Sequence, residues 1–368
     1  MKILHIINSL STGGAEKLIL ETVPEYNSRG LSVDVMLLNG SPSPFLDELQ
    51  RTGCCKIIVP GTSSPYRFKF IWEIVPQFRK YDLIHVHLFP SNYWAAFAKI
   101  ISRASVPLVF TEHSTSNRRF RNPVFRVINA VVYRSFTKTV CITDDVKAVV
   151  KANTLLRENK LTVIQNGVPI RKYASARALS RHKIHSSLGE DDFLLVQIAS
   201  FRAAKDQATL IRALLNLPER FKVLLVGEGP GRKEHEKLVE MMDLQGRVYF
   251  LGVTSDIPSL LATCDIAVLS SNYEGFGIAA VEAMASGRPL IASDVPGLSE
   301  VVGGAGILFP KGDEKTLATE IFRLMNDEIY YGEVAQRCTE RAKDYDIDIM
   351  VARHIELYKS LVNPNVAG

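Results

Sequence analysis

The chain has 368 residues, of which 46% are hydrophobic and 23% are charged, a composition typical of globular proteins that excludes a disordered chain. Its longest apolar runs fall far short of the roughly 20 residues that span a bilayer, and its start lacks the apolar core and cleavage site of a signal peptide, so we expect a cytoplasmic protein. The five cysteines are odd in number and form no Cys-x-x-Cys pair, which excludes a disulfide framework and a cysteine-based zinc site.

The first part of the chain alternates short apolar runs with segments of helical period. Strands are predicted at KILHII, VDVMLL, LIHVH, PLVFT, TVCIT and LTVIQ, and helical segments such as AEKLILETV separate them. This alternation predicts βα units around a parallel sheet that is covered on both faces. Residues 1–170 carry 21 Lys and Arg against 12 Asp and Glu, so the basic surplus of the chain lies in this half.

A polar segment at residues 166–192 lacks strand-like runs and predicts a linker. After it, further strands are predicted at FLLVQIA, FKVLLVG, VYFLG, DIAVLS, RPLIAS and AGILF. We therefore expect an α/β protein with two Rossmann-like, doubly wound domains, residues 1–170 and 171–346, and a final helix at 347–363 that completes the first. Because ligands bind at the carboxyl ends of parallel strands, we expect the domains to face a central cleft.

Two glycine-rich turns follow predicted strands. Gly13 and Gly14 precede a helical segment, where backbone N–H groups can meet an anion, although a tight turn explains Gly-Gly equally well. The glycines of VGEGPGR have the spacing G-x-G-x-G instead of the G-x-G-x-x-G of dinucleotide sites, and the next strand ends without an acidic residue. These observations argue against NAD binding.

Two cations follow the first strand of the second domain. Arg202 and Lys205 lie in ASFRAAKDQATL, just before a helical segment. Positive charge is unfavourable at the positive end of a helix dipole, which favours a functional role over a solvated helix start. Two such cations can clamp a diphosphate, and each charged hydrogen bond contributes roughly 1.5–3 kcal/mol.

The segment EGFGIAAVEAMASG places Glu274 in a loop and Glu282 about one turn inside a helix. Gly275 and Gly277 allow the backbone to approach a ligand closely. The amides that would point at an anion belong to Gly277, Ile278 and Ala279. Carboxylates accept hydrogen bonds from vicinal hydroxyls. One acid could therefore bind a sugar ring and the other a ribose, while the amides bind the phosphates. This combination predicts a nucleotide-sugar site.

The pattern E-x7-E within YEGFGIAAVEAMASGRPLIASDVPGLSEVV resembles the signature of retaining GT-B glycosyltransferases of family 4. GGAEK, TEHS, VIQNGV and FRAAKDQATLIRA resemble further family motifs, as do VGEGPGR and VYFLGVTSDIP, and the resemblance covers most of the chain. The chain departs from the family at ASFRAAKD, where many members have Gly-Arg-Leu, and at VPGLSE, where Gly-Gly is common.

This resemblance implies transfer of a sugar from a UDP- or GDP-sugar with retention at the anomeric carbon, without a metal or other cofactor. It implies that Arg202 and Lys205 stabilise the leaving diphosphate, that Glu274 orients the sugar, and that main-chain groups near Val253 contact the base. The donor-binding residues expected on this basis are Gly13, Gly14, Arg202, Lys205, Val253, Glu274, Gly275, Phe276, Gly277, Ile278, Ala279 and Glu282.

His113 closes the strand VFTEHS, where it can hydrogen-bond the transferred sugar or assist the acceptor; a packed or solvated ring is the alternative. His85 and His87 lie on one strand face and could bind a metal together with His113, but no acidic ligands accompany them, so we predict no metal. The predicted catalytic residues are Glu274, Arg202, Lys205 and His113.

A basic and aromatic segment follows His113. Between Glu112 and Asp144 the chain has no acidic residue, whereas it contains Arg118, Arg119, Arg121, Arg126, Arg134 and Lys138 with Phe120, Phe125 and Tyr133. This composition suits an anionic membrane surface or a lipid-diphosphate acceptor, and a solvated basic face is the alternative. No nucleic-acid-binding module surrounds the segment, so we expect no nucleic-acid partner.

We therefore predict a retaining, metal-independent glycosyltransferase of the hexosyltransferase type. It would transfer sugar to a glycan or lipid-linked acceptor in the synthesis of a capsule, exopolysaccharide or O-antigen, at the inner face of the plasma membrane. One alternative is an epimerase or hydrolase on the same fold, which would turn over donor without an acceptor. Another is a catalytically silent nucleotide-sugar-binding subunit, against which Arg202, Lys205, Glu274 and Glu282 argue.

Overall fold

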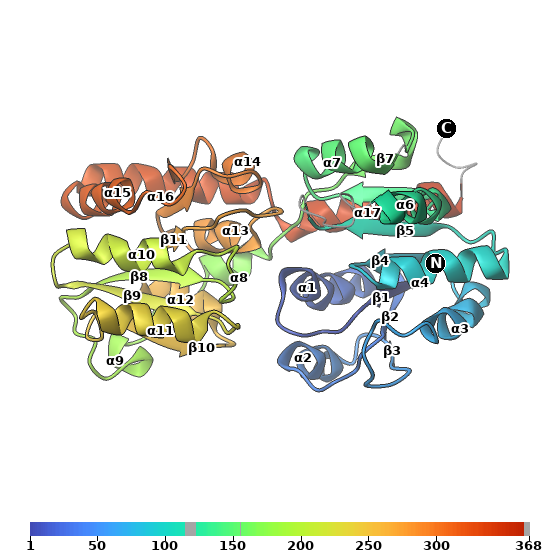
Figure 1. Ribbon diagram of the computed structural model, residues 1–368, viewed down its shortest axis with the longest axis horizontal. Coiled ribbons are helices and arrows are strands. Elements are labelled where there is room, and N and C mark those ends of the chain that lie inside the picture. Colours follow the sequence, from blue (N-terminus) through green and yellow to red (C-terminus); the bar gives the residue numbers. More distant parts are fainter. Residues whose placement is uncertain (115–122, 155, 364–368) are drawn as a thin grey trace. The chain divides into compact units, whose positions relative to one another are not determined.

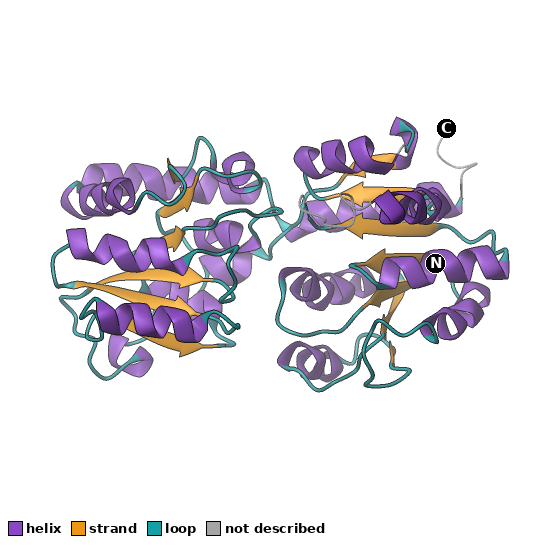
Figure 2. Cartoon of the chain, in the orientation of Figure 1, coloured by secondary structure: helices purple, strands orange, loops and turns teal. Residues whose placement is uncertain are grey.

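The computed structural model describes residues 1–114, 123–154 and 156–363. The chain divides into two compact units. Unit 1 comprises Met1–Gly167 together with the C-terminal segment that begins at Ile347, and unit 2 comprises Val168–Asp346. In each unit, strands form a parallel sheet with helices against it (Figure 1; Figure 2). The expected α/β class with two Rossmann-like units is confirmed, and the boundary lies a few residues before the expected one.

The sheet of unit 1 has seven strands in the order β3-β2-β1-β4-β5-β6-β7, and all of its pairings are parallel. The strands are β1 (Lys2–Ile7), β2 (Ser32–Leu37), β3 (Ile57–Ile58), β4 (Leu83–His87), β5 (Leu108–Glu112), β6 (Lys138–Cys141) and β7 (Leu161–Val163). Five strands follow the predicted runs closely, and β7 is shorter than its run. The two-residue edge strand β3 was not predicted, because two isoleucines give no periodic signal.

The helices of unit 1 are α1 (Gly14–Ser28), α2 (Pro44–Thr52), α3 (Phe70–Ile74), α4 (Ser91–Ser102), α6 (Pro123–Ser135), α7 (Asp144–Thr154) and α17 (Ile347–Val362). Helix α17 packs against α1, whereas α4 packs against both α3 and α6. The predicted final helix therefore belongs to unit 1. Its packing against the first helix explains why the chain returns to this unit after completing the other.

The sheet of unit 2 has six parallel strands in the order β10-β9-β8-β11-β12-β13. These strands are β8 (Phe193–Ile198), β9 (Phe221–Val226), β10 (Val248–Gly252), β11 (Ile266–Leu269), β12 (Leu290–Ser293) and β13 (Ile307–Phe309). Its helices are α8 (Ile170–Ala174), α9 (Arg181–Ile184), α10 (Gln207–Ala213), α11 (Arg232–Met241), α12 (Ile257–Thr263), α13 (Ile278–Ala285), α14 (Leu298–Val302), α15 (Glu314–Asn326) and α16 (Glu328–Lys343).

The segment 166–192 is not the structureless linker that its composition predicts. It contains α8 and α9, and α8 packs against α12 and α13. Arg181 of α9 donates to the Glu190 carbonyl at 3.1 Å and forms an ion pair with Asp265 at 3.4 Å. Helices as short as α8 and α9 show little apolar periodicity in the sequence. The prediction of a linker from polar composition was therefore wrong for this segment.

Candidate active site

The charged residues predicted to bind a diphosphate lie where the strand order of unit 2 reverses. β8 and β11 are neighbours in the sheet, although β9 and β10 lie between them in the sequence. The chain leaving β8 carries Arg202 and Lys205, and the chain leaving β11 carries Glu274. In open parallel sheets, ligands bind at the carboxyl ends of the strands at such a reversal. The fold therefore brings these three residues to one edge of one sheet.

Lys205 and Glu274 form an ion pair at this edge. The Lys205 ammonium donates a hydrogen bond to Glu274 Oε1, and the Ser271 hydroxyl donates to the same oxygen at 3.0 Å. The two charged side chains are 25% and 12% exposed, so solvent screens the pair less than a surface ion pair. An ammonium has three protons, and Lys205 can keep Glu274 while it donates to a phosphate oxygen.

Arg202 provides the second cation of the site. Its side chain is exposed, and its guanidinium has no hydrogen bond or ion pair with another residue in the described part of the chain. The guanidinium fork matches the geometry of phosphate oxygens. Arg202 is therefore available to a ligand without first giving up a protein partner.

Hydrogen bonds tie together the two loops that carry these residues. The Asn272 side chain donates to the Ala203 carbonyl at 2.7 Å, and the Asn272 amide donates to the Ala204 carbonyl at 2.8 Å. Ser270 Oγ donates to the Asp206 carbonyl at 2.8 Å, and Gln197 Nε2 donates to the Lys205 carbonyl at 2.9 Å. These bonds hold the backbone of both loops in place before any ligand binds, which favours electrostatic preorganisation.

Two glycines shape the approach to helix α13. Gly277, at the N-cap, has a φ of 88°, and a Cβ there would lie 2.6 Å from Leu298 Cδ2. Gly297 has a φ of 85°, and a Cβ there would lie 2.6 Å from the Glu274 carbonyl oxygen. The first turn of α13 is closed by Ala280 N–H donating to the Gly277 carbonyl at 2.8 Å, which leaves the preceding amides of Ile278 and Ala279 at the helix N-terminus for an anion.

Three other predicted donor-binding residues differ in exposure. Glu282 lies in α13 and is buried, with 3% of its surface exposed. Phe276 is also buried and packs edge-on against Tyr345, with ring centroids 5.3 Å apart. Of the two parts of Phe276, the backbone is therefore the one that can face a ligand. Val253 follows β10 and is 51% exposed.

The glycine-rich turns have structural functions of their own. A Cβ at Gly227 would lie 2.3 Å from the Ala199 carbonyl oxygen, and one at Gly229 would lie 2.5 Å from the Phe201 carbonyl oxygen. These glycines thus let the turn after β9 pack against the loop that leads to Arg202. In unit 1, Gly13 is the N-cap of α1, and a Cβ there would lie 2.3 Å from the Glu16 carboxylate.

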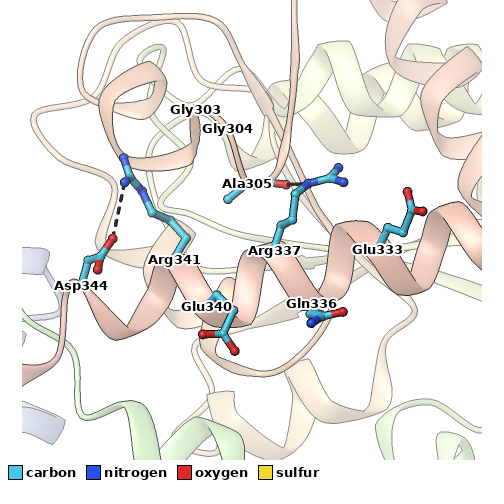
Figure 3. A pocket seen from close by; sticks show the side chains of 9 residues that line it. All are labelled: Gly303, Gly304, Ala305, Glu333, Gln336, Arg337, Glu340, Arg341 and Asp344. Carbon is cyan, nitrogen blue, oxygen red and sulfur yellow. Dashed lines mark hydrogen bonds and ion pairs between the residues drawn. The ribbon is translucent and has the colours of Figure 1, made fainter.

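A hollow of about 700 Å³ lies elsewhere on unit 2, between α16 and the turn after α14 (Figure 3). Arg341 donates from Nη2 to the Glu300 carbonyl at 2.8 Å and from Nε to the Val301 carbonyl at 3.1 Å, and it pairs with Asp344 at 3.4 Å. A cation at the C-terminal carbonyls of a helix such as α14 is stabilising. None of the predicted site residues lines this hollow.

In unit 1, histidines from β1, from β4, from the loop after β5 and from one helix gather beside the reversal between β1 and β4. His5 pairs with His85 across the two strands, and both are 1% exposed. His5 Nδ1 lies 3.0 Å from His87 Nε2, and His87 Nδ1 lies 3.3 Å from His113 Nε2. His113 follows β5 and is partly exposed.

Helix α17 completes this cluster. Its Tyr358 hydroxyl lies 2.6 Å from His85 Nδ1, and His85 Nε2 lies 2.7 Å from Thr111 Oγ1. His354 Nδ1 donates to the Met350 carbonyl at 3.0 Å. Sequence analysis singled out His85, His87 and His113 but missed His5 and His354. A histidine inside KILHII was the available signal for His5, since burying a polar side chain requires a partner.

Burial keeps these imidazoles neutral. Removal from solvent lowers the pKa of His5 to about 3, that of His113 to about 4 and that of His354 to about 4, in each case with burial as the main cause. Burial also lowers the pKa values of His85 and His87 well below the usual range, and neighbouring histidines add to the effect. The cluster is therefore uncharged at neutral pH.

The predicted acceptor or membrane residues Arg118, Arg119 and Arg121 lie outside the described residues. Their neighbour Glu112 is buried at the end of β5 and accepts a hydrogen bond from the Tyr133 hydroxyl at 2.7 Å. No helix in residues 1–114, 123–154 and 156–363 is long and apolar enough to cross a membrane.

Comparisons with known proteins agree with this arrangement. Residues 12–172 match the model of "Glycosyltransferase Family 4", and residues 180–345 match that of "Glycosyl transferases group 1". An uncharacterized glycosyltransferase of Methanocaldococcus jannaschii is 30% identical over 67% of each chain. The N,N'-diacetylbacillosaminyl-diphospho-undecaprenol alpha-1,3-N-acetylgalactosaminyltransferase of Campylobacter jejuni is 30% identical over 66% of each chain.

Among solved structures, HepE of Anabaena in complex with UDP-glucose is 26% identical, with a TM-score of 0.84 over 98% of this chain and 100% of that one. The two parallel-sheet units and the match to HepE identify a GT-B fold. The chain belongs to the GT-B glycosyltransferases of family 4.

Proposed function

We propose that this glycosyltransferase moves a hexosyl group from a UDP- or GDP-sugar to a glycan or lipid-diphosphate acceptor, with retention and without a bound metal, in surface polysaccharide synthesis at the inner face of the plasma membrane. The observation that carries the proposal is the Lys205–Glu274 pair beside Arg202 and the N-terminus of α13. The similarity to HepE with UDP-glucose supports the donor class, and the similarity to the undecaprenol-dependent enzyme supports a lipid-linked acceptor.

The leaving diphosphate gains negative charge as the bond to the anomeric carbon breaks. Arg202 and Lys205 would donate to its oxygens, and the amides at the start of α13 would supply further donors. Together these groups would supply a positive potential around the leaving diphosphate. Losing one preorganised donor of this kind costs on the order of 10²–10³ in rate.

Glu274 would orient the sugar instead of attacking it. Its Oε1 already accepts from Lys205 and from Ser271, which lowers its nucleophilicity and leaves the second carboxylate oxygen for sugar hydroxyls. We therefore favour front-face attack, in which the acceptor oxygen bonds to the anomeric carbon as the diphosphate leaves, and a diphosphate oxygen takes the acceptor proton. Glu282 would bind the donor ribose, and His113 would contact the transferred sugar or the acceptor.

The membrane contact proposed for the segment with Arg118, Arg119 and Arg121 has support among the described residues. Unit 1 exposes three aromatic side chains at and before α3: Tyr66 is 60% exposed, Phe68 is 73% exposed and Trp72 is 66% exposed. Within residues 83–143, Glu112 is the only acidic residue of the sequence, and it is buried. Exposed aromatic residues in a unit that also contains this acid-poor stretch of sequence suit the boundary of an anionic bilayer.

A panel of UDP-, GDP-, ADP- and dTDP-sugars in a thermal-shift assay tests the donor. One class should raise Tm, because a ligand at 100 times its Kd adds about 2.7 kcal/mol of stability. The stabilising donor is then incubated with and without lipid-diphosphate acceptors, and the anomeric configuration of the product is determined by NMR. Inversion, a requirement for added metal, or donor turnover without an acceptor would each contradict the proposal.

A further inference from the structure

The neutral imidazoles of unit 1 form an ordered series of hydrogen bonds that ends at a predicted catalytic residue. We call it the histidine chain, and its members in order are Thr111, His85, Tyr358, His5, His87 and His113. Its longest link joins the Tyr358 hydroxyl to His5 Nε2 at 3.5 Å, and the other links measure 2.6–3.3 Å.

Proton counting couples the members of this chain. A neutral imidazole has one N–H donor and one bare nitrogen, so a ring that accepts at one nitrogen must donate at the other. A phenol hydroxyl likewise has one proton to donate. The Tyr358 hydroxyl also has a hydrogen bond with Tyr26, and when Tyr358 donates to a member of the histidine chain, two uniform arrangements result. In one, every proton points from His113 towards Thr111; in the other, every proton points from Thr111 towards His113.

The distances at His85 favour the first arrangement. The 2.6 Å between the Tyr358 hydroxyl and His85 Nδ1 lies within the range of O–H donors and below the 2.7–3.2 Å typical of N–H···O bonds. Tyr358 then donates to Nδ1, and His85 must donate from Nε2 to Thr111, at 2.7 Å. Continued along the chain, this direction places a proton on Nε2 of His113.

We propose that the histidine chain fixes the tautomer of His113, so that Nε2 carries the ring proton and Nδ1 is held bare as an acceptor for a hydroxyl of the sugar substrate. Nδ1 of this ring has no hydrogen-bond partner among the described residues, and the ring is partly exposed. The intervening Tyr358, His5 and His87 are positioning residues. The catalytic benefit rests on the proposed function, whereas the tautomer itself does not.

A metal ion is the competing explanation of the cluster. His5, His85 and His87 each offer a ligand atom, and these atoms lie within 4.8 Å of one another. However, both ring nitrogens of each of these residues already have hydrogen-bond partners. A metal would have to displace several of these bonds, so the hydrogen-bonded chain explains the geometry with fewer changes.

NMR of the full-length protein labelled with ¹⁵N-histidine tests the tautomer, because protonated and bare ring nitrogens have separate shifts. The sequence has eight histidines, and His113→Asn identifies the signal of interest. We expect His113 to show a single neutral tautomer with a protonated Nε2. A protonated Nδ1, or a mixture of tautomers, in the unmodified protein would overturn the proposal, as would a stoichiometric metal ion found by elemental analysis.

Tyr358→Phe then breaks the chain by removing one buried hydroxyl. We expect His113 to become a mixture of tautomers and kcat to fall roughly 10-fold, the lower end of the loss known for partners that orient metal-ligating histidines. KM for the nucleotide-sugar should be nearly unchanged. Tyr81→Phe is the matched control, since it removes another hydroxyl of unit 1, bonded to Asp34 at 2.8 Å. If the His113 spectrum of Tyr358→Phe is unchanged, the histidine chain does not fix the tautomer of His113, and the proposal is overturned.

The two proposals fail separately. If no nucleotide-sugar is transferred to any acceptor, the proposed function fails, but the tautomer of His113 can still be measured. If transfer proceeds and Tyr358→Phe changes the tautomer without lowering kcat, the histidine chain sets the tautomer but has no role in catalysis. If Tyr358→Phe does not fold, the spectrum of the unmodified protein still decides the tautomer.

Discussion

The two sheet reversals of this protein hold polar groups in opposite ways. At the reversal between β8 and β11, Arg202, Lys205 and Glu274 are charged, carried on loops and in part open to solvent. At the reversal between β1 and β4, the histidines are neutral and mostly buried, and His5 and His85 lie within the strands themselves. The same topology thus holds a group of charged side chains in unit 2 and a cluster of neutral side chains in unit 1.

The largest effect that distinguishes the histidine cluster of unit 1 from the charged residues of unit 2 should be the pH dependence of the unfolding free energy. In unit 1, burial lowers the folded-state pKa of His5 to about 3 and those of His113 and His354 to about 4, below the unfolded value of 6.5. It also lowers the pKa values of His85 and His87 well below 6.5. Their stabilisation is therefore complete above pH 6.5 and is lost as the pH falls towards 4, because the unfolded chain binds more protons. Each such histidine should lower the unfolding free energy by about 1.4 kcal/mol per pH unit in that window.

Urea denaturation at a series of pH values between 7.5 and 5 measures this slope. His354→Gln should reduce it, whereas replacing the exposed His182 of unit 2 should leave it unchanged. A slope that is the same in both variants would mean that the cluster is not neutral in the folded state.

Lys205→Ala tests the charged site. It removes the proposed donor to the diphosphate and leaves Glu274 without its cation, so transfer should fall on the order of 10²–10³-fold. Binding of the bare nucleoside diphosphate, measured by calorimetry, should also weaken. Lys222→Ala is the control, because Lys222 of the same unit is similarly shielded, at 17% exposure, and pairs with Asp192 outside the site. Equal kinetics in the two variants would remove Lys205 from the mechanism.

Gly297→Ala tests whether backbone packing positions Glu274. The new Cβ would meet the Glu274 carbonyl at 2.6 Å on a backbone with a φ of 85°, so we expect a loss of roughly 1–3 kcal/mol in unfolding free energy and weaker binding of the nucleoside diphosphate. Gly246→Ala, which meets no atom within 4 Å, should change neither. If both variants match the unmodified protein in denaturation and calorimetry, the loop tolerates displacement.

The aromatic residues before and within α3 should give the smallest effect. Phe68→Ser or Trp72→Ser should each weaken sedimentation with anionic vesicles by about 1 kcal/mol, less than the roughly 1.5–3 kcal/mol for full burial of a large apolar side chain, because insertion is partial. Nucleotide affinity should not change. Ile329→Ser, at a 78% exposed position of unit 2, is the control. If both aromatic variants bind vesicles like the unmodified protein, these aromatic residues do not contact the membrane, and the segment around Arg118 is the remaining support for the membrane proposal.

Sequence patterns predicted the strands well because buried parallel strands are continuous apolar runs. They also placed Arg202, Lys205 and Glu274 at strand ends. They could not show that Lys205 and Glu274 pair, since 69 positions separate the two in the chain, or that Phe276 turns inwards against Tyr345. His5 and His354 escaped notice because their partners come from distant strands and from α17. The strand reversals alone did not reveal that a second polar cluster existed.

The position of α17 has a consequence for how the protein is made. On the ribosome, all of unit 2 emerges before Tyr358 and His354 do. Until then His5 and His85 lack the hydroxyl that lies between them in the finished fold. All of unit 2 is contiguous in the sequence, whereas unit 1 cannot complete its fold until its last helix, α17, has been synthesised. The side chains of α17 that complete the histidine cluster of unit 1 are therefore synthesised last.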